Sequence, residues 1–433
     1  MPCLLASALC AAAEFAPEEL TVGDAVARAL RDNPSVAAGE AQVRASQAAA
    51  RARARAGLPR LSVGLQATVT NDPLAAFGMR LQERDVEAAD FDPARLNSSD
   101  LLGSLGASAV VELPLFTGGR LSAASDAGQA RAAAQAAQQV FRRRLLAVSV
   151  VSAYFRSQLT ERQRRFSQQV LEDAKETERL VEARVRQELL PSSELARATA
   201  HRAQAEADLV AAEQRQADAR DELVLLAGEG ARTASLVSPV GTPSAPGPEP
   251  SAVERADVLA AREQERAAQA EADAARAAWW PQLGVKVQGG TLWGGGSALG
   301  AFATAGLGAQ WDVYAPTRGA EIESAQSAST AASLSRRWLE AQARTEVERA
   351  RRAVSSAQAR IRAAEEALAA AQAARDLRRA RHREGLLPLT ELLDAEGAVT
   401  VAHSGLLEAQ LAARLGWAKL ELALGQPIDG VGP

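Results

Sequence analysis

The chain has 433 residues, of which 47% are apolar but only 4% are aromatic. This composition favours long helices packed through small side chains over a compact domain built on large hydrophobic anchors. The 49 basic and 53 acidic residues leave a net charge of −4, which gives no reason to expect nucleic acid as a partner. Both cysteines lie in the first ten residues, which excludes a disulfide framework or a cysteine metal site from the rest.

Residues 1–13 resemble the end of a secretory signal peptide, because an apolar run is followed by small residues. The segment lacks the basic start of such a signal. Lipidation at Cys10 is the alternative, although Leu9 is larger than the residue expected before a lipidated cysteine. Elsewhere no apolar run approaches the ~18 residues of a transmembrane helix, so any membrane crossing must use strands.

A first repeat is predicted over residues 18–230. It begins with a helix over 21–55 that carries Asp24 in its first turn and ends before Pro59. Alternating apolar residues predict strands over 61–70 and 101–115, with a loop between them. A very long helix over 120–188, a turn at Pro191 and a helix over 192–227 complete the repeat.

A second repeat, over residues 252–425, has the same order of elements. The pattern predicts a helix over 252–278, strands over 282–290 and 300–314, and helices over 318–385 and 390–424. The Pro, Gly and Ser residues of 238–251 predict a linker between the repeats, and 426–433 form a tail.

Direct alignment supports this internal duplication. Residues 184–228 align without gaps to 381–425, at a constant offset of 381 − 184 = 197. The identical residues of the two copies include Arg184, Leu189, Leu190, Pro191, Glu194, Leu195 and Gly228 of the first copy.

The lengths of the elements predict an assembly of several copies. A helix of 65–70 residues spans roughly 100 Å, which is too long for a compact monomer. Each strand matches the ~9–11 residues that cross a bilayer at a tilt, and four such strands cannot close a barrel. Trp279, Trp280 and Trp311 fall at strand ends, where an aromatic interfacial belt would lie. Simple packing at helix–strand junctions is the alternative for these tryptophans.

Three motifs resemble the TolC-like outer membrane efflux protein family: the segment 20–50 (LTVGDAVARALRDNPSVAAGEAQVRASQAAA), LPLFTGGR at 113–120 and RHREGLLPLTELLDAE at 381–396. The resemblance implies a mixed α and β fold, in which long α-helical hairpins form a periplasmic tunnel. Four antiparallel β-strands of each copy would enter a shared trimeric transmembrane β-barrel in the bacterial outer membrane. The protein would be a passive conduit in a tripartite efflux or type I secretion system, without enzymatic activity or cofactor. The implied partners are two further copies, a periplasmic adaptor (membrane fusion protein), an inner-membrane pump and outer-membrane lipid.

The resemblance also implies roles for the two hairpin tips. Residues that match the adaptor-docking turn are Gly385, Leu386 and Thr390 in the second copy and Leu189, Ser193 and Glu194 in the first. Glu188 replaces the family's glycine in the first copy, which puts equal docking at both tips in doubt. Glu391 and Asp394 fall where some relatives carry an acidic ring at the tunnel entrance. The alternative for Glu391 is that it only charges the first turn of its helix, where acids are favoured.

Other features are interpreted more simply. The histidines His201, His382 and His403 are expected on the solvated surface, since they show no metal or nucleophile spacing. Residues 71–97 are long for a hairpin connection and are predicted to form an extracellular loop or partial lid. The competing function is a periplasmic coiled-coil scaffold or adaptor without a channel, which would need no membrane-length strands.

Overall fold

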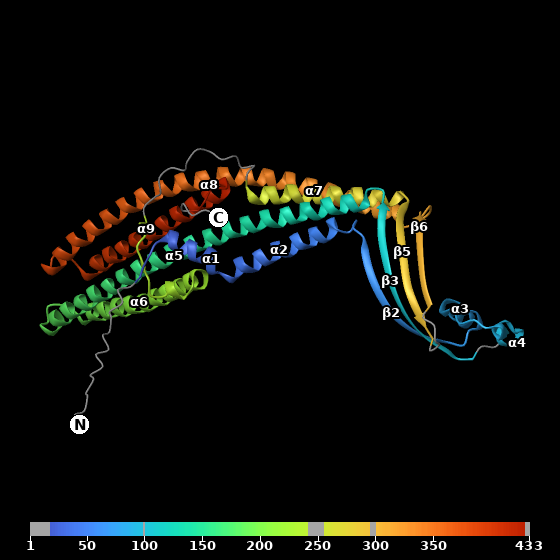
Figure 1. Ribbon diagram of the computed structural model, residues 1–433. Helices are drawn as coiled ribbons and strands as arrows, with labels where there is room; N and C mark the ends of the chain where they lie inside the picture. The colour runs from blue at the N-terminus through green and yellow to red at the C-terminus, as the bar shows by residue number, and fades with distance from the viewer. Residues whose placement is uncertain (1–17, 98–99, 241–254, 295–299, 429–433) are drawn as a thin grey trace, which may run out of the picture. The chain divides into compact units, whose positions relative to one another are not determined.

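The computed structural model describes residues 18–97, 100–240, 255–294 and 300–428 (Figure 1). The predicted signal segment 1–13 and most of the linker 238–251 lie outside these residues. The chain divides into two compact units. The first comprises Met1–Gln42, Ala136–Ala260 and Arg337–Pro433, and the second comprises Val43–Gln135 and Ala261–Arg336. Within the described residues, no helix is both long and apolar enough to cross a membrane.

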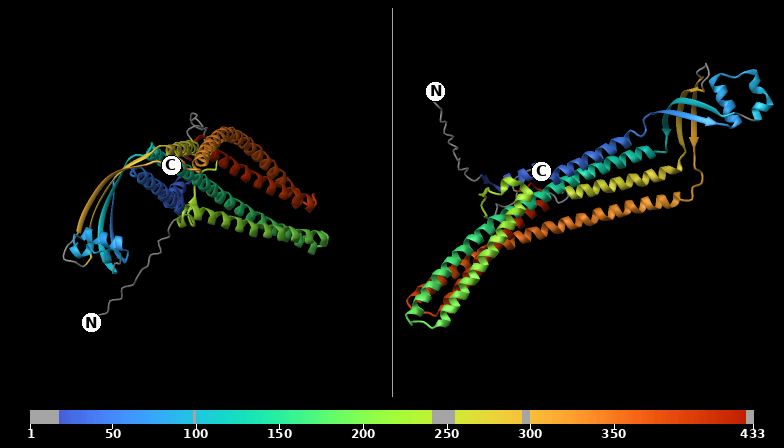
Figure 2. Two further views of the ribbon diagram at one scale, coloured as in Figure 1. Left: turned by 90° about the vertical axis from the view of Figure 1, so that its right-hand side faces the viewer. Right: turned by 90° about the horizontal axis from the view of Figure 1, so that it is seen from below.

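Four helices run from one unit into the other: α2 (Pro34–Ala54), α5 (Arg120–Arg186), α7 (Ala256–Arg276) and α8 (Arg318–Arg383). The first unit also holds α1 (Val22–Asp32), α6 (Ser192–Ala227), α9 (Leu389–Leu424), the short helix η2 (Glu229–Ala231) and strands β1 (Glu19–Leu20) and β4 (Ser235–Leu236). The hairpins α5–α6 and α8–α9 lie side by side with their turns at the same end (Figure 2). Long helical hairpins are therefore confirmed.

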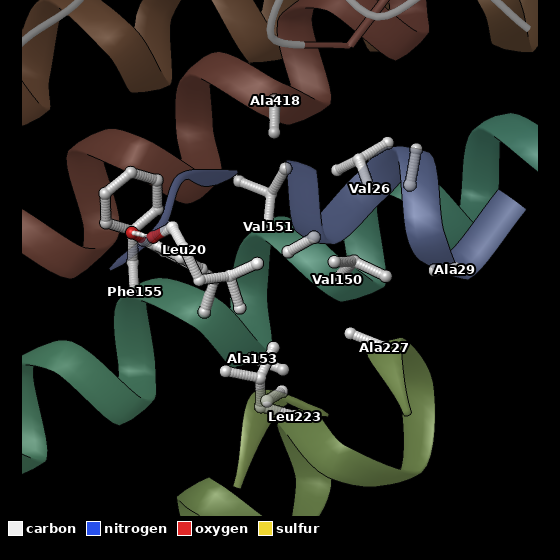
Figure 3. Close-up of a cluster of buried hydrophobic side chains, with 14 of the residues drawn as sticks. Leu20, Val26, Ala29, Val150, Val151, Ala153, Phe155, Leu223, Ala227 and Ala418 are labelled. Carbon is white, nitrogen blue, oxygen red and sulfur yellow. Dashed lines mark hydrogen bonds between the residues drawn. The ribbon is translucent and has the colours of Figure 1, made fainter. Parts of the chain in front are cut away.

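The core of the first unit gathers segments that are far apart in sequence (Figure 3). Leu20 of β1 and Val26 of α1 pack with Val150 and Phe155 of α5 and with Leu223 of α6, and all are buried. Burial of each such side chain contributes about 1.5–3 kcal/mol. The Tyr154 hydroxyl donates to the Leu20 carbonyl at 2.6 Å, and parallel pairing of β1 with β4 completes this junction.

The second unit contains the four-stranded antiparallel sheet that the alternation predicts. Its strands β2 (Arg60–Thr70), β3 (Leu102–Phe116), β5 (Gln282–Trp293) and β6 (Gly300–Gln310) pair in the order β2-β3-β5-β6 (Figure 1). Each repeat supplies one hairpin, and β3 and β5 join the two. The short helix η4 (Ala277–Trp279) leads into β5.

The predicted helix over 21–55 is two helices, separated at Asn33. Pro34 has no N–H to donate, so α1 ends there and α2 begins. Asn33 serves both ends: its backbone N–H donates to Ala29, and its side-chain oxygen accepts from the backbone N–H of Ser35 at 3.0 Å. The start of α1 is as predicted, since Thr21 and Asp24 form a capping box.

The segment expected to be a loop contains helices α3 (Pro73–Glu83), η1 (Ala88–Phe91) and α4 (Pro93–Asn97). Two Asp-Pro pairs begin α3 and α4. The Asp72 side chain accepts from the Leu74 N–H at 3.2 Å, and that of Asp92 accepts from the Ala94 N–H at 2.9 Å. An aspartate N-cap followed by proline is a helix-start signal that outweighs the polar composition of the segment.

Two strand ends also differ from the prediction. β5 continues to Trp293 instead of ending at 290, and β6 ends at Gln310 instead of 314. Trp311 therefore lies just beyond the strand, where its indole N–H donates to the Trp279 carbonyl at 3.1 Å.

Candidate functional site

The sheet separates polar from apolar side chains according to residue number. Even-numbered residues pair with even-numbered residues across the sheet: Arg60 with Glu112, Glu112 with Lys286, and Gln282 with Gln310. They therefore share one face, up to a bulge in β3 between Pro114 and Phe116. That even-numbered face carries all the charged residues of the strands. The odd-numbered face carries none.

The odd-numbered face is almost wholly apolar, with Thr291 as its one polar residue. Its large side chains on the two outer strands are strongly exposed: Leu65 of β2 is 86% exposed and Leu307 of β6 is 74% exposed. An exposed apolar face of this size is unfavourable in water and is typical of a surface that contacts lipid or protein. Its members on β2 and β6 are Leu61, Val63, Leu65, Ala67, Val69, Ala301, Ala303, Ala305, Leu307 and Ala309.

On the even-numbered face, Lys286 and Glu112 lie 3.5 Å apart, and Arg60 is paired across from Glu112. Glutamine, serine, threonine and glycine fill most of the remaining positions before the bulge, and the apolar exceptions are Leu102, Val110, Pro114, Leu292 and Phe302. Both outer strands, β2 and β6, have only one neighbour among the described residues, so each leaves a row of backbone N–H and C=O groups without a strand partner.

The three predicted belt residues lie together at one end of the sheet. Pairing of Gln282 with Gln310 brings the start of β5 to the end of β6, so Trp279, Trp280 and Trp311 are neighbours. Each is more than half exposed, and the Arg318 guanidinium lies 4.9 Å from the centre of the Trp279 ring. An interfacial aromatic belt requires placement of this kind at strand ends.

The LPLFTGGR motif forms the turn from β3 into α5. Gly118 and Gly119 have φ of 62° and 86°, in the left-handed region that favours glycine. A Cβ on Gly118 would lie only 2.8 Å from the Trp280 Cγ, so space as well as backbone conformation requires glycine there. The motif thereby fixes the start of the long helix against the tryptophans.

The two hairpin turns share one backbone geometry, which extends the duplication to single hydrogen bonds. The Leu189 N–H donates to the Arg184 carbonyl at 2.9 Å, and the Leu386 N–H donates to the Arg381 carbonyl at 2.9 Å. These bonds are typical of a Schellman turn at a helix end. The left-handed position is Gly385, with φ of 78°, in one copy and Glu188, with φ of 57°, in the other.

The structure places the predicted tip residues in these turns and in the first turns of the following helices. Leu189 and Leu386 are 68% and 72% exposed. Ser193 is exposed, whereas Glu194 and Thr390 are half-buried. Glu391 and Asp394 are both exposed on one side of α9, three residues apart.

A small hydrophobic cluster holds the two hairpins together near their ends. Val181 of α5, Ala198 of α6 and Leu389 and Leu392 of α9 are each at most 2% exposed. Arg184 adds polar contacts by donating to the carbonyls of His382 and Arg383 at 3.2 and 2.7 Å.

A charged cluster missed by the sequence reasoning takes one residue from each of the four helices. Arg379 of α8 donates to Asp173 of α5 at 2.9 Å and to Glu396 of α9 at 3.0 Å. His201 of α6 lies 3.2 Å from Glu396, close enough for an ion pair but not aligned for a hydrogen bond. Burial alone would lower the pKa of Arg379, but the hydrogen bonds to both carboxylates outweigh it and raise that pKa.

The prediction that the histidines lie on the solvated surface is wrong for His382, which is buried, whereas His201 and His403 are half-buried. His382 is 7% exposed, and its Nδ1 lies 2.9 Å from the Leu387 carbonyl. The His403 ring stacks on Phe166 at 3.9 Å, and burial lowers the pKa of His403. Among the described residues there is no group of three His, Cys, Asp or Glu residues that could hold a metal.

Comparisons with known proteins agree with this geometry. The family model described as outer membrane efflux protein matches residues 25–229 and 248–426. A search of curated proteins found no match.

Several solved structures have the same fold. The outer membrane protein VceC of Vibrio cholerae is 21% identical, with 94% of this chain and 97% of that chain covered and a TM-score of 0.78. The CmeC outer membrane channel of Campylobacter jejuni is 14% identical, with 93% and 85% covered and a TM-score of 0.81. The MtrE outer membrane channel of Neisseria gonorrhoeae is 21% identical, with 94% and 89% covered and a TM-score of 0.75.

Long paired hairpins joined to a two-faced sheet define a channel-forming subunit of the outer membrane. The chain belongs to the outer membrane efflux protein family.

Proposed function

We propose that three copies of the chain close one barrel in the outer membrane and act as the passive conduit of a tripartite efflux or type I secretion system. The observation that carries this proposal is the separation of side chains on the sheet. Lipid would contact the apolar odd-numbered face, and a water-filled lumen would contact the even-numbered face with Arg60, Glu112 and Lys286.

The two outer strands support the sharing of the barrel between copies. In lipid the free N–H and C=O groups of β2 and β6 would each cost several kcal/mol without a partner. Pairing β2 of one copy with β6 of the next satisfies them, and three copies give twelve strands. A coiled-coil scaffold has no use for such a sheet, so this observation favours the channel over that alternative.

The hairpin ends would then form the periplasmic entrance. We propose that Leu386 and Leu189 dock the adaptor together with Gly385, Thr390, Ser193 and Glu194. The adaptor in turn contacts an inner-membrane pump. Exposed leucines in turns of fixed backbone geometry offer apolar anchors for a partner helix.

Glu391 and Asp394 would give an acidic ring of six carboxylates at the entrance, raising the local cation concentration. The favourable interaction of an acidic side chain with the first turn of α9 is enough to account for Glu391. Asp394 lies beyond that turn, so this interaction does not account for it. Its exposure on the same side therefore favours the ring.

Ion conductance through planar bilayers tests the proposal. The purified protein should form long-lived pores that select cations in a salt gradient. The Glu391→Gln, Asp394→Asn double variant should insert equally well but lose much of that selectivity, while Glu384→Gln in the adjacent turn should keep it. Absence of pores would contradict the channel, and pores with unchanged selectivity in the double variant would contradict the ring.

A further inference from the structure

Residues 71–101 are not needed to connect β2 to β3. Thr70 pairs directly with Leu102, so a two-residue turn could join the strands. The chain instead inserts α3, η1 and α4 at this end of the sheet (Figure 1). An insertion that the hairpin does not require needs another explanation.

The insertion is a small folded body with its own contacts. Arg80 of α3 forms an ion pair with Asp90 of η1 at 2.8 Å, and Asp90 is 6% exposed. The rings of Phe77 and Phe91 meet edge to face at 5.6 Å. Contacts of this kind hold the three short helices in one arrangement.

This body rests on the even-numbered face. Ser104, an even-numbered residue of β3 that is 6% exposed, donates to the Met79 sulfur of α3 at 3.3 Å. The C-terminal end of α3 lies against the first residue of β6: a Cβ on Gly300 would overlap the Gln82 carbonyl oxygen and lie 2.8 Å from the Glu83 Cα. Gly300 is also even-numbered, so two strands place the helix on the same face.

The contact between α3 and the sheet includes the buried carboxyl group of Glu83. The residue is 4% exposed, and its Oε1 has no hydrogen-bond partner among the described residues. A Cβ on Gly294, at the end of β5, would collide with that carboxyl group. Glycines at 294 and 300 therefore make room for α3, and a buried polar group of this kind is retained at a cost in stability.

We propose that residues 73–97 form a plug that docks on the lumen face of the sheet through Met79, Glu83 and Gly300 and narrows the outer end of the channel. The inference rests on the proposed function, because the even-numbered face is a lumen only if copies close a barrel. The plug would be a narrowing additional to the proposed acidic ring at the periplasmic entrance. It lies at the end of the strands that is opposite to Trp279, Trp280 and Trp311.

A single methyl group tests the plug. Gly300→Ala should displace α3, because its Cβ meets backbone atoms that cannot rotate away. Gly306→Ala is a matched control on the same strand and the same face, where an added Cβ meets nothing within 4 Å. Single-channel conductance in planar bilayers should rise in Gly300→Ala and stay at the wild-type level in Gly306→Ala.

A second variant keeps the test informative if Gly300→Ala fails to assemble. Replacement of residues 71–101 by Asn-Gly leaves the Thr70–Leu102 pair intact and should give the largest conductance. Pores of wild-type conductance in both this variant and Gly300→Ala would overturn the plug while leaving the channel in place. Absence of pores in the wild-type protein would instead overturn the proposed function on which the plug rests.

Discussion

At the scale of single residues, the two hairpin turns make a natural comparison, because one backbone conformation is occupied by Glu188 in one copy and by Gly385 in the other. A residue other than glycine costs about 1–2 kcal/mol in the left-handed region, and glycine removes this strain. Glycine also makes the unfolded chain more flexible, which offsets part of the stabilisation. We therefore expect Glu188→Gly to stabilise the protein by roughly 0.5–1 kcal/mol.

Thermal unfolding of the detergent-solubilised protein measures this effect. The midpoint should rise in Glu188→Gly and fall in Gly385→Ala, which places a side chain in the same conformation of the other copy. Equal midpoints in the two variants would show that the left-handed position carries no strain.

Glu83 should make the proposed plug respond to pH. Burial raises the pKa of its carboxyl group, the nearby Asp85 raises it further, and Arg80 partly opposes both. Since the docked pKa lies above that of a free glutamate, docking is most stable below the free value of about 4.3 and weakens as pH rises through the docked value. Conductance should therefore be smallest in acid and increase towards neutral pH.

The other groups around Glu83 do not change this sign. Arg80 is engaged by Asp90, and Gly294 and Gly300 bring no charge from β5 and β6. Glu83→Gln keeps the shape but cannot ionise, so its conductance should stay at the low acid level across the pH range. A Gln variant that retains the wild-type pH profile would assign the titration to another group.

At the scale of elements, the charged cluster between the hairpins should matter more than any exposed ion pair. Arg379→Met would remove the arginine that pairs with Asp173 and with Glu396, which is 7% exposed, and would leave only His201 beside Glu396. Loss of one partner costs about 3–5 kcal/mol in a fully buried pair, and the cost is smaller here because Arg379 and Asp173 are 24% and 22% exposed. Arg381→Met, at an exposed position two residues away, is the control.

Chemical unfolding followed by circular dichroism distinguishes the two arginines. The midpoint should drop clearly for Arg379→Met and change little for Arg381→Met. Similar midpoints would mean that water or a rearranged side chain replaces the arginine, and that the cluster does not hold the hairpins together.

Adaptor docking belongs to this scale as well. A photo-crosslinking residue at Leu386, which is 72% exposed in the turn, should give an adduct with a membrane fusion protein in intact cells. The same residue at Val401, which is 75% exposed on the body of α9, should give none. Equal adducts from both positions, or none from Leu386, would contradict docking at the tips.

The sequence predicted the regular elements better than their junctions. Long alternating and helical patterns located the four strands and both hairpins, because periodicity is a signal summed over many residues. The break at Pro34 and the helices begun by Asp72-Pro73 and Asp92-Pro93 depend on single residues, and a pattern summed over many residues does not locate them.

The candidate site was predictable only where it is local. Gly385 and Leu386 were identified because a short local motif resembles that of a known family, and the structure places both residues in the turn. The cluster of Asp173, His201, Arg379 and Glu396 could not be found in the same way, because its members come from four helices and depend on how those helices pack.

At the scale of the whole molecule, the central claim is that one chain is an incomplete barrel that only further copies can close. That claim explains three features of the described residues: two outer strands with a neighbour on one side only, an exposed apolar face, and helices much longer than a compact domain needs. No property of a single copy explains them together.

Native mass measurement of the protein extracted from outer membranes tests this claim most directly. A species of three copies that dissociates on heating, with both helix and strand in its circular dichroism, is the predicted result. A stable monomer or dimer would contradict the shared barrel, and the lumen, the acidic ring and the plug would then have to be abandoned with it.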